Sequence, residues 1–331
     1  MNFENLKKTF IVAEIGNNHE GSFELACKLI NKAKETGVDA VKFQTFKTED
    51  FIHPSEKKRF KILKKFELTN ENFYKLSVIS KKKGLKFIST PFDLKSAVFL
   101  SNLVDLFKIA SGDNNYNKLI ETVLKYKKPT LISTGLLNFT ELLNLYKFIK
   151  SKKFSLSRLA FLHCVSAYPV PDNEINLLSI KFLKEKFPIT VGFSDHTLGL
   201  YASVAAIVLG AKIVEKHFTI DNNFSRFRDH KISLNPHDMK KLVNSIRLIE
   251  KMLGKNEKRI QPSESKNLFS IRRSLYASRN IYKNSIININ DVSILRPLYL
   301  LNPNDLKKII NNKTKTFIKK DKGFSFKELS N

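Results

Sequence analysis

Short apolar runs that end in polar residues recur along the chain, and amphipathic stretches separate most of them. Residues 10–15 (FIVAEI) form the first run, after which Leu25, Leu29, Ile30 and Ala33 recur at helical spacing. Eight such units precede the polar stretch that begins near residue 254. Near-continuous apolar strands alternating with amphipathic helices predict a parallel sheet covered by helices. Eight units predict an α/β fold of the closed (β/α)8 type, a TIM barrel. An open doubly wound sheet is the alternative, although no G-x-G-x-x-G follows the first run.

The polar residues of these runs lie almost entirely at the carboxyl ends, which carry the active site in a TIM barrel. Lys42 and Lys108 are embedded in VKF and FKI, and a buried lysine is rare unless something pairs with it. The two lysines predict an anionic ligand group; the alternative is that they pair with Glu14 or Glu215 for structure alone. The polar residues of the strand ends are Glu14, Lys42, Thr90, Lys108 with Ser111, Ser133, Ser166, Ser194 with His196, and Glu215 with His217.

Two of these strand ends carry a histidine. His196 follows the apolar run at residues 189–193, and His217 follows the run at residues 211–214. Successive strands would bring both imidazoles to one end of the sheet, where neutral imidazole nitrogens can bind a divalent metal. The alternative is that each histidine hydrogen-bonds locally at its strand end.

The periodicity also predicts the helices and a second domain. Residues 45–68 are expected to be a long polar loop, and residues 286–289 a short β segment followed by a helix start at Asn290 and Asp291. A β segment is also expected at residues 274–277. We expect a barrel over residues 1–262, a linker over residues 263–272 and a small domain over residues 273–331. The further helices are expected at residues 70–83, 95–102, 118–126, 140–150, 177–186 and 236–253.

The net charge of the chain bears on whether it binds nucleic acid or small anions. Lysine and arginine total 58 against 31 aspartate and glutamate, a formal net charge of +27. The lysines are spread in short groups, so we expect no nucleic-acid partner but a basic surface that attracts small anions. No apolar run approaches the about eighteen residues of a membrane span, and residues 1–9 are no secretory signal, so we expect a cytoplasmic protein without a membrane partner. Cys27 and Cys164 are expected to be buried small hydrophobic residues.

Nine ordered motifs carry a resemblance to a known family. They are AEIGNNHEG (13–21), AVKFQTF (40–46), ISTPF (88–92), FKIASGD (107–113), ISTG (132–135), HCVSAYP (163–169), GFSDHTLG (192–199), EKHFT (215–219) and DHKISLNP (229–236). Together they resemble the sialic acid synthase family, a TIM barrel followed by a C-terminal antifreeze-like (SAF) domain. The resemblance implies a transferase that condenses phosphoenolpyruvate with N-acetylmannosamine or a related 2-acetamido hexose to a nine-carbon 2-keto sugar acid. The diacetamido-trideoxy hexoses that lead to legionaminic or pseudaminic acid stay open as substrates.

The same resemblance implies roles for individual residues. It assigns a divalent metal, Mn²⁺ or Mg²⁺, to His196 and His217, a catalytic carboxylate to Glu14, and a group beside the metal to Glu215. It implies a domain-swapped homodimer, with Arg296 reaching into the partner's barrel. The phosphoenolpyruvate-binding positions would be Lys42, Thr90, Lys108, Ser111, Ser133, Ser166 and Ser194, and the sugar-contacting positions Gln44, Asp113, Tyr168 and Asp229.

Two other functions remain open at this point. A metal-free aldolase would use Lys42 or Lys108 as a Schiff base. A basic sugar- or nucleic-acid-binding protein would have an inactive barrel, although a purely structural barrel has no use for polar residues at so many strand ends.

Overall fold

The computed structural model describes residues 1–330, which divide into two compact units. The first unit comprises residues 1–254, and the second begins at Lys255. The domain bounds drawn from the sequence, with a linker at residues 263–272, stay a prediction. Within residues 1–330 no helix is both long and apolar enough to cross a membrane.

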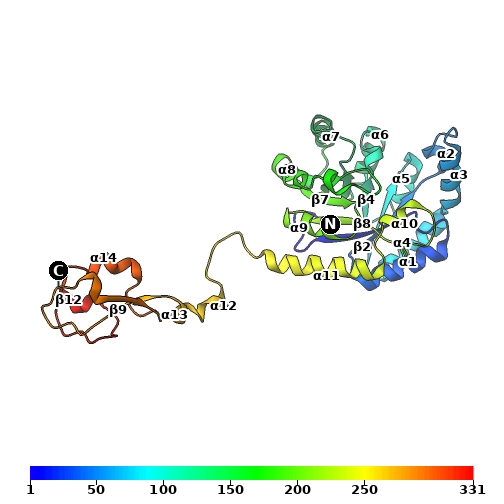
Figure 1. Ribbon diagram of the computed structural model, residues 1–331. Helices are drawn as coiled ribbons and strands as arrows, with labels where there is room; N and C mark the ends of the chain where they lie inside the picture. The colour runs from blue at the N-terminus through cyan, green and yellow to red at the C-terminus, as the bar shows by residue number, and fades with distance from the viewer. Residues whose placement is uncertain (331) are drawn as a thin grey trace. The chain divides into compact units, whose positions relative to one another are not determined.

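Eight parallel strands form a closed barrel in the first unit (Figure 1). Neighbours in the barrel follow chain order, and the register of Phe10–Glu14 with Ile213–His217 closes it between the last strand and the first. The predicted TIM barrel is confirmed, and the open sheet is excluded. The strands are β1 (Phe10–Gly16), β2 (Ala40–Thr45), β3 (Lys86–Pro91), β4 (Leu106–Ile109), β5 (Thr130–Ser133), β6 (Leu159–Cys164), β7 (Thr190–Asp195) and β8 (Ile213–His217).

Helices surround the barrel (Figure 1). The helix predicted after the first strand is present, and so are the six further helices, whose ends differ from the prediction by at most two residues. The helices of this unit are α1 (Phe23–Thr36), α2 (Thr48–Phe51), α3 (Lys57–Phe66), α4 (Asn70–Lys82), α5 (Leu94–Leu100), α6 (Asn117–Lys125), α7 (Phe139–Ser151), α8 (Leu178–Lys186), α9 (Tyr201–Val208), α10 (Arg228–Ile232) and α11 (Pro236–Leu253).

The predicted polar loop at residues 45–68 is wrong, because helices α2 and α3 lie within it. A small apolar cluster around Phe46, Ile52 and Leu63 holds this segment together. The rings of Phe51 and Phe92 stack there with centroids 4.3 Å apart. Helix α9, YASVAAIV, also lies outside the prediction, because it is apolar on nearly every side and shows no amphipathic period.

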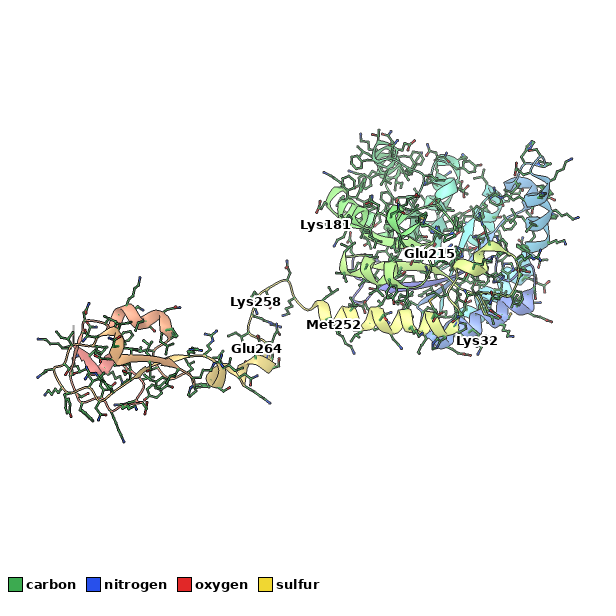
Figure 2. All side chains as sticks on the ribbon, in the orientation of Figure 1. Lys32, Lys181, Glu215, Met252, Lys258 and Glu264 are labelled. Carbon is green, nitrogen blue, oxygen red and sulfur yellow. The ribbon has the colours of Figure 1, made fainter. Side chains whose placement is uncertain are left out.

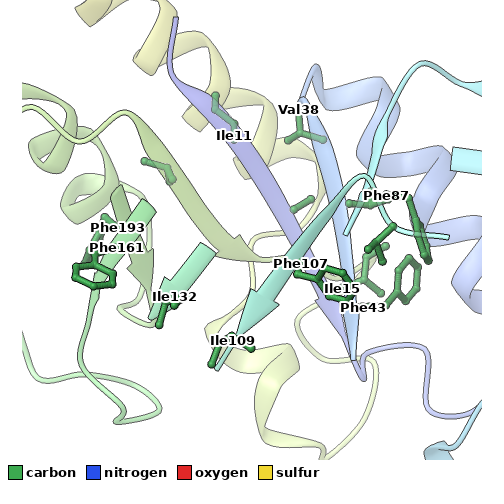
Figure 3. Close-up of a cluster of buried hydrophobic side chains, with 14 of the residues drawn as sticks. Ile11, Ile15, Val38, Phe43, Phe87, Phe107, Ile109, Ile132, Phe161 and Phe193 are labelled. Carbon is green, nitrogen blue, oxygen red and sulfur yellow. The ribbon is translucent and has the colours of Figure 1, made fainter. Parts of the chain in front are cut away.

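The outward faces of the strands pack against the helices. This face carries Phe43, Phe87, Phe107, Phe161 and Phe193, all of them buried, and Figure 3 shows them with the aliphatic side chains of the same cluster. Burial of aromatic side chains contributes strongly to stability, since each removes a large apolar area from water. This outer layer therefore fixes the barrel on which the site is built.

A second apolar cluster fills the barrel interior. Side chains alternate between the two faces of a strand, so the inward residues lie one position away from the outward ones. Strand β7 contributes Gly192, where a Cβ would lie 2.5 Å from Leu162 Cδ2 and 2.6 Å from the carbonyl oxygen of Ile213. The interior is thus packed too tightly for a ligand, which must bind above it. The inward set is Phe10, Val12, Ala40, Ile88, Leu106, Leu131, Ala160, Leu162 and Ile213, with Phe3 packed beside it.

The second unit has a small core of its own, which includes Leu275, Ile281 and Phe324. Its strands form two antiparallel pairs, as expected of a small β domain. The strand predicted at residues 274–277 is confirmed. Residues 286–289 form one isolated bridge, from Ile286 to Lys313, in place of the predicted strand. The elements are β9 (Ser274–Ala277), β10 (Val292–Leu295), β11 (Lys313–Thr314), β12 (Leu329–Ser330), α12 (Pro262–Ser265), α13 (Leu268–Ile271) and α14 (Leu306–Ile309).

The helix start predicted at Asn290 and Asp291 is also wrong. Both residues lie in a 3-10 turn, Ile289–Asp291, that leads directly into β10. The side chain of Asp291 accepts from the backbone N–H of Asn288, a capping contact that serves a turn as well as a helix. The residue that caps this turn is Asn288, two positions before the predicted start.

Candidate active site

A layer of mostly polar side chains lies directly above the apolar interior. On every strand, the residue two positions beyond the last inward apolar residue, or beyond Gly192 on β7, is polar or a cysteine. Side chains two apart point to the same face of a strand, so all of them project inward at the carboxyl end. Figure 2 places Glu215 inside the barrel unit, whereas Lys32 and Lys181 lie at its periphery. The layer is Glu14, Lys42, Thr90, Lys108, Ser133, Cys164, Ser194 and Glu215.

Two lysines and two glutamates in this layer form a buried network of ion pairs. Lys42 Nζ lies 2.9 Å from Glu14 Oε2 and 3.7 Å from Glu215 Oε1. Lys108 Nζ donates to Glu215 Oε1 at 2.7 Å. The four side chains are at most 5% exposed. The lysines are thus paired with Glu14 and Glu215, as expected if they served structure alone. An anion that entered the site would compete with these two carboxylates for the same ammonium groups.

The two carboxyl groups of this network differ in acidity. Burial disfavours the charged form of Glu215, but the two ammonium groups and the Ser194 hydroxyl outweigh it and hold the pKa of Glu215 at about 2. Burial raises the pKa of Glu14, and Lys42 offsets this only in part. Glu215 therefore stays ionised, while Glu14 is the carboxyl group whose pKa is shifted toward the range useful for proton transfer.

Three serine hydroxyls gather at the ends of β4, β5 and β6. Ser111 follows β4, Ser133 ends β5 and Ser166 follows β6. Across the described residues 1–330, none of the three buried Oγ atoms has a hydrogen-bond partner. A Cβ on Gly135 would lie 2.6 Å from Ser166 Oγ and 2.7 Å from Ser111 Oγ, so the glycine keeps this space open. Buried hydroxyls are normally hydrogen-bonded, so this cradle indicates a ligand with several acceptor atoms.

His196 and His217 lie together at the ends of β7 and β8, with ring centroids 5.5 Å apart. His196 Nδ1 is 2.9 Å from the carbonyl oxygen of Val165, so this nitrogen donates and Nε2 is left for a ligand. His217 Nδ1 is buried and has no hydrogen-bond partner among residues 1–330. Burial, and then the neighbouring cations, hold the pKa of His217 well below its usual value, which keeps the ring neutral. Burial also lowers the pKa of His196, but its contacts with Cys164 Sγ and the Val165 carbonyl outweigh burial and raise that pKa, so an ion would have to displace a proton from Nε2 of His196. With that proton displaced, both imidazoles fit a divalent metal.

No group of three or more His, Cys, Asp or Glu side chains within residues 1–330 is arranged to hold a metal ion. An ion bound by His196 and His217 would therefore keep coordination positions for water or for substrate oxygens. Open positions are typical of catalytic metal sites, whereas structural sites are closed by protein ligands.

The residues expected to contact the sugar lie around this centre. The ring of Tyr168 packs on that of His196, with centroids 4.2 Å apart. Gln44 links the loop after β1 to the ion network, because it accepts from Asn17 Nδ2 at 2.8 Å and donates to Glu14 Oε1 at 3.2 Å. Asp229 lies in α10, beyond β8, and is buried. The fourth residue, Asp113, shares a 3-10 turn with Ser111 of the serine cradle.

Asn17 and Arg228 are further polar residues of this region that the sequence reasoning missed. The Arg228 guanidinium carbon lies 4.6 Å from the Tyr168 ring centroid, and Arg228 Nε is 3.2 Å from Asp229 Oδ1. Arg228 therefore connects two of the expected sugar contacts. Its place directly before Asp229 was the available signal. Arg296 is not among the residues that the barrel brings together, because it belongs to the second unit.

Asp113 leads to a prediction about pH. Its Oδ2 atom is buried and unpartnered across the described residues, and burial raises the pKa of Asp113 to about 6. Below that pH the carboxyl group is neutral and loses acceptor capacity. The family resemblance implies that Asp113 contacts a hexose, and under that assignment the apparent KM for the hexose should rise as the pH falls through about 6. Steady-state kinetics at several pH values would measure this, with the KM for the second substrate that the resemblance implies, phosphoenolpyruvate, followed as a control. A hexose KM that shows the same pH dependence in Asp113→Asn would contradict the assignment.

The fold and the polar strand ends together define a TIM-barrel enzyme. Comparison with known proteins gives its family: the model of the NeuB family matches residues 29–258, more than half of the chain. The chain belongs to the NeuB family of sugar acid synthases, and the resemblance drawn from the nine motifs is confirmed.

Three similar proteins illustrate the relationship. An uncharacterized protein of Methanocaldococcus jannaschii is 42% identical over 308 residues, which cover 93% of this chain and 90% of that protein. The N,N'-diacetyllegionaminic acid synthase of Campylobacter jejuni is 38% identical over 306 residues, 88% of this chain and 91% of that enzyme. The crystal structure of N-acetylneuraminic acid synthetase from Leptospira borgpetersenii superposes with a TM-score of 0.75 at 33% identity, over 79% of this chain and 90% of that chain.

Proposed function

We propose that this protein condenses phosphoenolpyruvate with a 2-acetamido hexose and water to give a nine-carbon 2-keto sugar acid and phosphate. In this reaction the enol carbon of phosphoenolpyruvate bonds to the aldehyde carbon of the open-chain sugar. Water adds to the oxocarbenium-like centre that results, and the tetrahedral intermediate then releases phosphate. Family membership supports the reaction class, and the observation that carries the proposal for this chain is the serine cradle beside two buried lysines.

The cradle suits the phosphate group. Ser111, Ser133 and Ser166 offer three hydroxyl donors around the space that Gly135 leaves open. Lys42 and Lys108 supply two ammonium groups, which act as point charges toward phosphate or carboxylate. Thr90 lies 3.2 Å from Lys42 Nζ and Ser194 lies 3.0 Å from Glu215 Oε1, so both hydroxyls lie at the edge of the same network.

The two glutamates have different roles in this proposal. Glu14 takes the proton from the attacking water, since its raised pKa makes it the better proton acceptor near neutral pH. Glu215 stays ionised and stabilises the positive charge that develops at the reacting carbon. The sugar is oriented by Gln44, Asp113, Tyr168 and Asp229; of these, Tyr168 packs on His196 and Gln44 contacts Glu14.

A divalent ion, Mn²⁺ or Mg²⁺, would be held by His196 and His217. When bound, it would polarise the aldehyde oxygen of the sugar as a Lewis acid. Each imidazole offers a nitrogen to the ion. The hydrogen bond of His196 Nδ1 to the Val165 carbonyl leaves Nε2 of His196 for the ion, and the lowered pKa of His217 keeps that ring neutral.

The test of the function is phosphate release from phosphoenolpyruvate across a panel of hexoses, with and without manganese. The panel contains N-acetylmannosamine and the diacetamido-trideoxy hexoses of legionaminic and pseudaminic acid synthesis. We expect release only with an acetamido hexose present, and a nine-carbon acid as product by mass spectrometry. Absence of release with every sugar would overturn the proposal. Borohydride trapping of a keto acid on Lys42 or Lys108 would favour the Schiff-base aldolase in its place.

A diacetamido-trideoxy hexose is the second candidate for the sugar. The Campylobacter jejuni relative named for legionaminic acid synthesis is 38% identical over 88% of this chain, compared with 33% for the structure named for N-acetylneuraminic acid. Arg228, stacked on Tyr168, adds donors at the sugar side that can reach a second acetamido oxygen. The same panel decides between the candidates through kcat/KM.

We also propose that a second copy of the chain completes the site with its Arg296. The arginine is exposed in the second unit, and the apolar side chains of Leu295, Tyr299 and Leu300 beside it are each about half exposed or more. Exposed apolar residues around an arginine suit a surface that packs on another chain.

A mixing experiment tests this exchange. His217→Ala and Arg296→Ala chains, each inactive alone, are unfolded and refolded together. If Arg296 acts on the partner's barrel, mixed dimers contain one intact site, and random pairing restores roughly a quarter of wild-type activity. Confirmed mixed dimers without activity would show that the arginine serves its own barrel or has no role.

A further inference from the structure

A completely buried ion pair joins the two strands that carry His196 and His217. Lys216 Nζ lies 3.1 Å from Asp195 Oδ2, and both side chains are 0% exposed. The two residues are direct neighbours across β7 and β8, since Asp195 and Lys216 are paired in the register. Each of them immediately precedes one of the two histidines.

The carboxylate of this pair is fully hydrogen-bonded. Asp195 Oδ1 accepts from Thr197 N at 2.8 Å and from Thr197 Oγ1 at 2.7 Å. Asp195 Oδ2 also accepts from Ser203 Oγ in helix α9 at 2.6 Å. Lys216 Nζ donates in turn to the carbonyl oxygen of Thr197 at 2.5 Å. Asp195 and Lys216 therefore connect Thr197, the residue after His196, to β8, the strand that carries His217.

The alternation of side chains places this pair behind the imidazoles. Asp195 and Lys216 have the parity of Phe193 and Val214, which face the helices, whereas Ser194, Glu215 and His217 face the interior. Neither charged side chain therefore belongs to the network of Lys42, Lys108 and the two glutamates.

The energetics of burial argue for a positional role. Removing two charges from water costs several kcal/mol per ion, and apolar replacements of buried pairs are often neutral or stabilising. The corresponding outward positions two residues earlier, Phe193 and Val214, are apolar, as expected for this layer. A buried pair at these positions has a stability cost that an apolar pair would not have, but it fixes the spacing of two backbones through directional contacts.

We propose that the Asp195–Lys216 pair positions His196 and His217 for a divalent metal. It sets the separation and orientation of the two imidazoles, and so sets the affinity of the protein for the ion. Asp195 and Lys216 are positioning residues, which touch neither the ion nor the substrates. The inference rests on the metal site of the proposed function.

The test is the affinity of the metal-free protein for Mn²⁺ alone, measured from the electron paramagnetic resonance signal of free Mn²⁺. The principal variant is Asp195→Asn with Lys216→Met, which removes both charges and leaves no unpaired ion. Partners that hydrogen-bond a metal-ligating histidine typically contribute 10–100-fold to metal affinity. Because Asp195 and Lys216 act on the histidines through the backbone, we expect the Kd for Mn²⁺ to rise by roughly tenfold, the lower end of that range. Saturating Mn²⁺ should then restore most of the turnover, with the KM for phosphoenolpyruvate unchanged.

Two controls separate this role from a loss of stability. The pair formed by Arg247 Nη2 and Asp39 Oδ2, 3.0 Å apart and partly buried, joins α11 to the residue before β2. Asp39→Asn with Arg247→Met should lower the melting temperature without changing the Kd for Mn²⁺. His217→Ala should abolish Mn²⁺ binding, which identifies the site that is being titrated.

The outcomes distinguish the two proposals. If the wild-type protein binds no Mn²⁺, the metal site of the proposed function fails and this inference fails with it. If the wild-type protein and the Asp195→Asn, Lys216→Met variant bind Mn²⁺ equally tightly, only the positioning role is wrong. Equal weakening in the Asp39→Asn, Arg247→Met control would also overturn the positioning role, because the effect would then follow stability alone.

Discussion

Replacing His217 by alanine should lower turnover by ~10²-fold or more, the loss expected when a Lewis acid is removed from a reaction at a carbonyl group. We expect this loss because His217 is placed to bind the ion. Its Nδ1 atom is buried and free of hydrogen bonds among residues 1–330, and its ring centroid lies 5.5 Å from that of His196. His196→Ala should have an effect of the same order. Chelation of the wild-type enzyme should abolish turnover and added manganese should restore it, as measured by phosphate release.

The control for this prediction is His53→Ala. His53 is an exposed histidine of the first unit whose Nδ1 bonds only its neighbour Ser55, so its loss should leave turnover unchanged. Full activity of His196→Ala and His217→Ala in the presence of chelator would show that the imidazoles hold no catalytic ion.

Replacing Lys108 by methionine should raise the apparent KM for phosphoenolpyruvate by roughly 10–100-fold and change the KM for the hexose little, because a charge-assisted contact to one substrate is lost. The same change leaves Glu215 buried without its closest cation, 2.7 Å away. Breaking a buried pair in this way costs about 3–5 kcal/mol of stability. We therefore expect a lower melting temperature as well as weaker binding.

A double variant separates these two effects. Lys108→Met with Glu215→Gln removes the uncompensated charge and should recover much of the melting temperature, while the KM for phosphoenolpyruvate stays high. If both KM values changed equally in Lys108→Met, the lysine would not be assigned to phosphoenolpyruvate. If the double variant regained the wild-type KM, the single variant would have acted through stability alone.

The strand ends are the part of the site that the sequence predicted well. The residues Glu14, Lys42, Lys108 and Glu215 each stand two positions beyond an inward apolar residue, and the barrel brings all four together. A period of two residues is a local property of a strand, so the chain reveals it without any tertiary contact. His196 and His217 could also be placed side by side, because each follows an apolar run and the two runs are successive strands, β7 and β8.

The loops were predicted less well. Helices α2 and α3 form where a loop was expected; they are only four and ten residues long, and the Phe46, Ile52 and Leu63 cluster holds them in place. Arg228 was not assigned to the site because its contact with the Tyr168 ring is made between two distant segments, α10 and the loop after β6. Contacts between loops depend on how each loop folds back over the barrel, which no short sequence period encodes.

The sequence by itself determined eight strand-helix units, favoured their closure into a barrel over an open sheet, and determined the chemical type of the side chains at the strand ends. These follow from local patterns, namely apolar strands, helical periods and polar strand ends, which act within a few residues. Only the tertiary structure decided which groups pair. Closure of the barrel brings β8 beside β1, so that Glu215 reaches the lysines of β2 and β4. The pairing of β7 with β8 sets Asp195 against Lys216. The acidity of a buried carboxyl group depends on such partners at a few ångströms, which is why the difference between Glu14 and Glu215 emerges only in the folded chain.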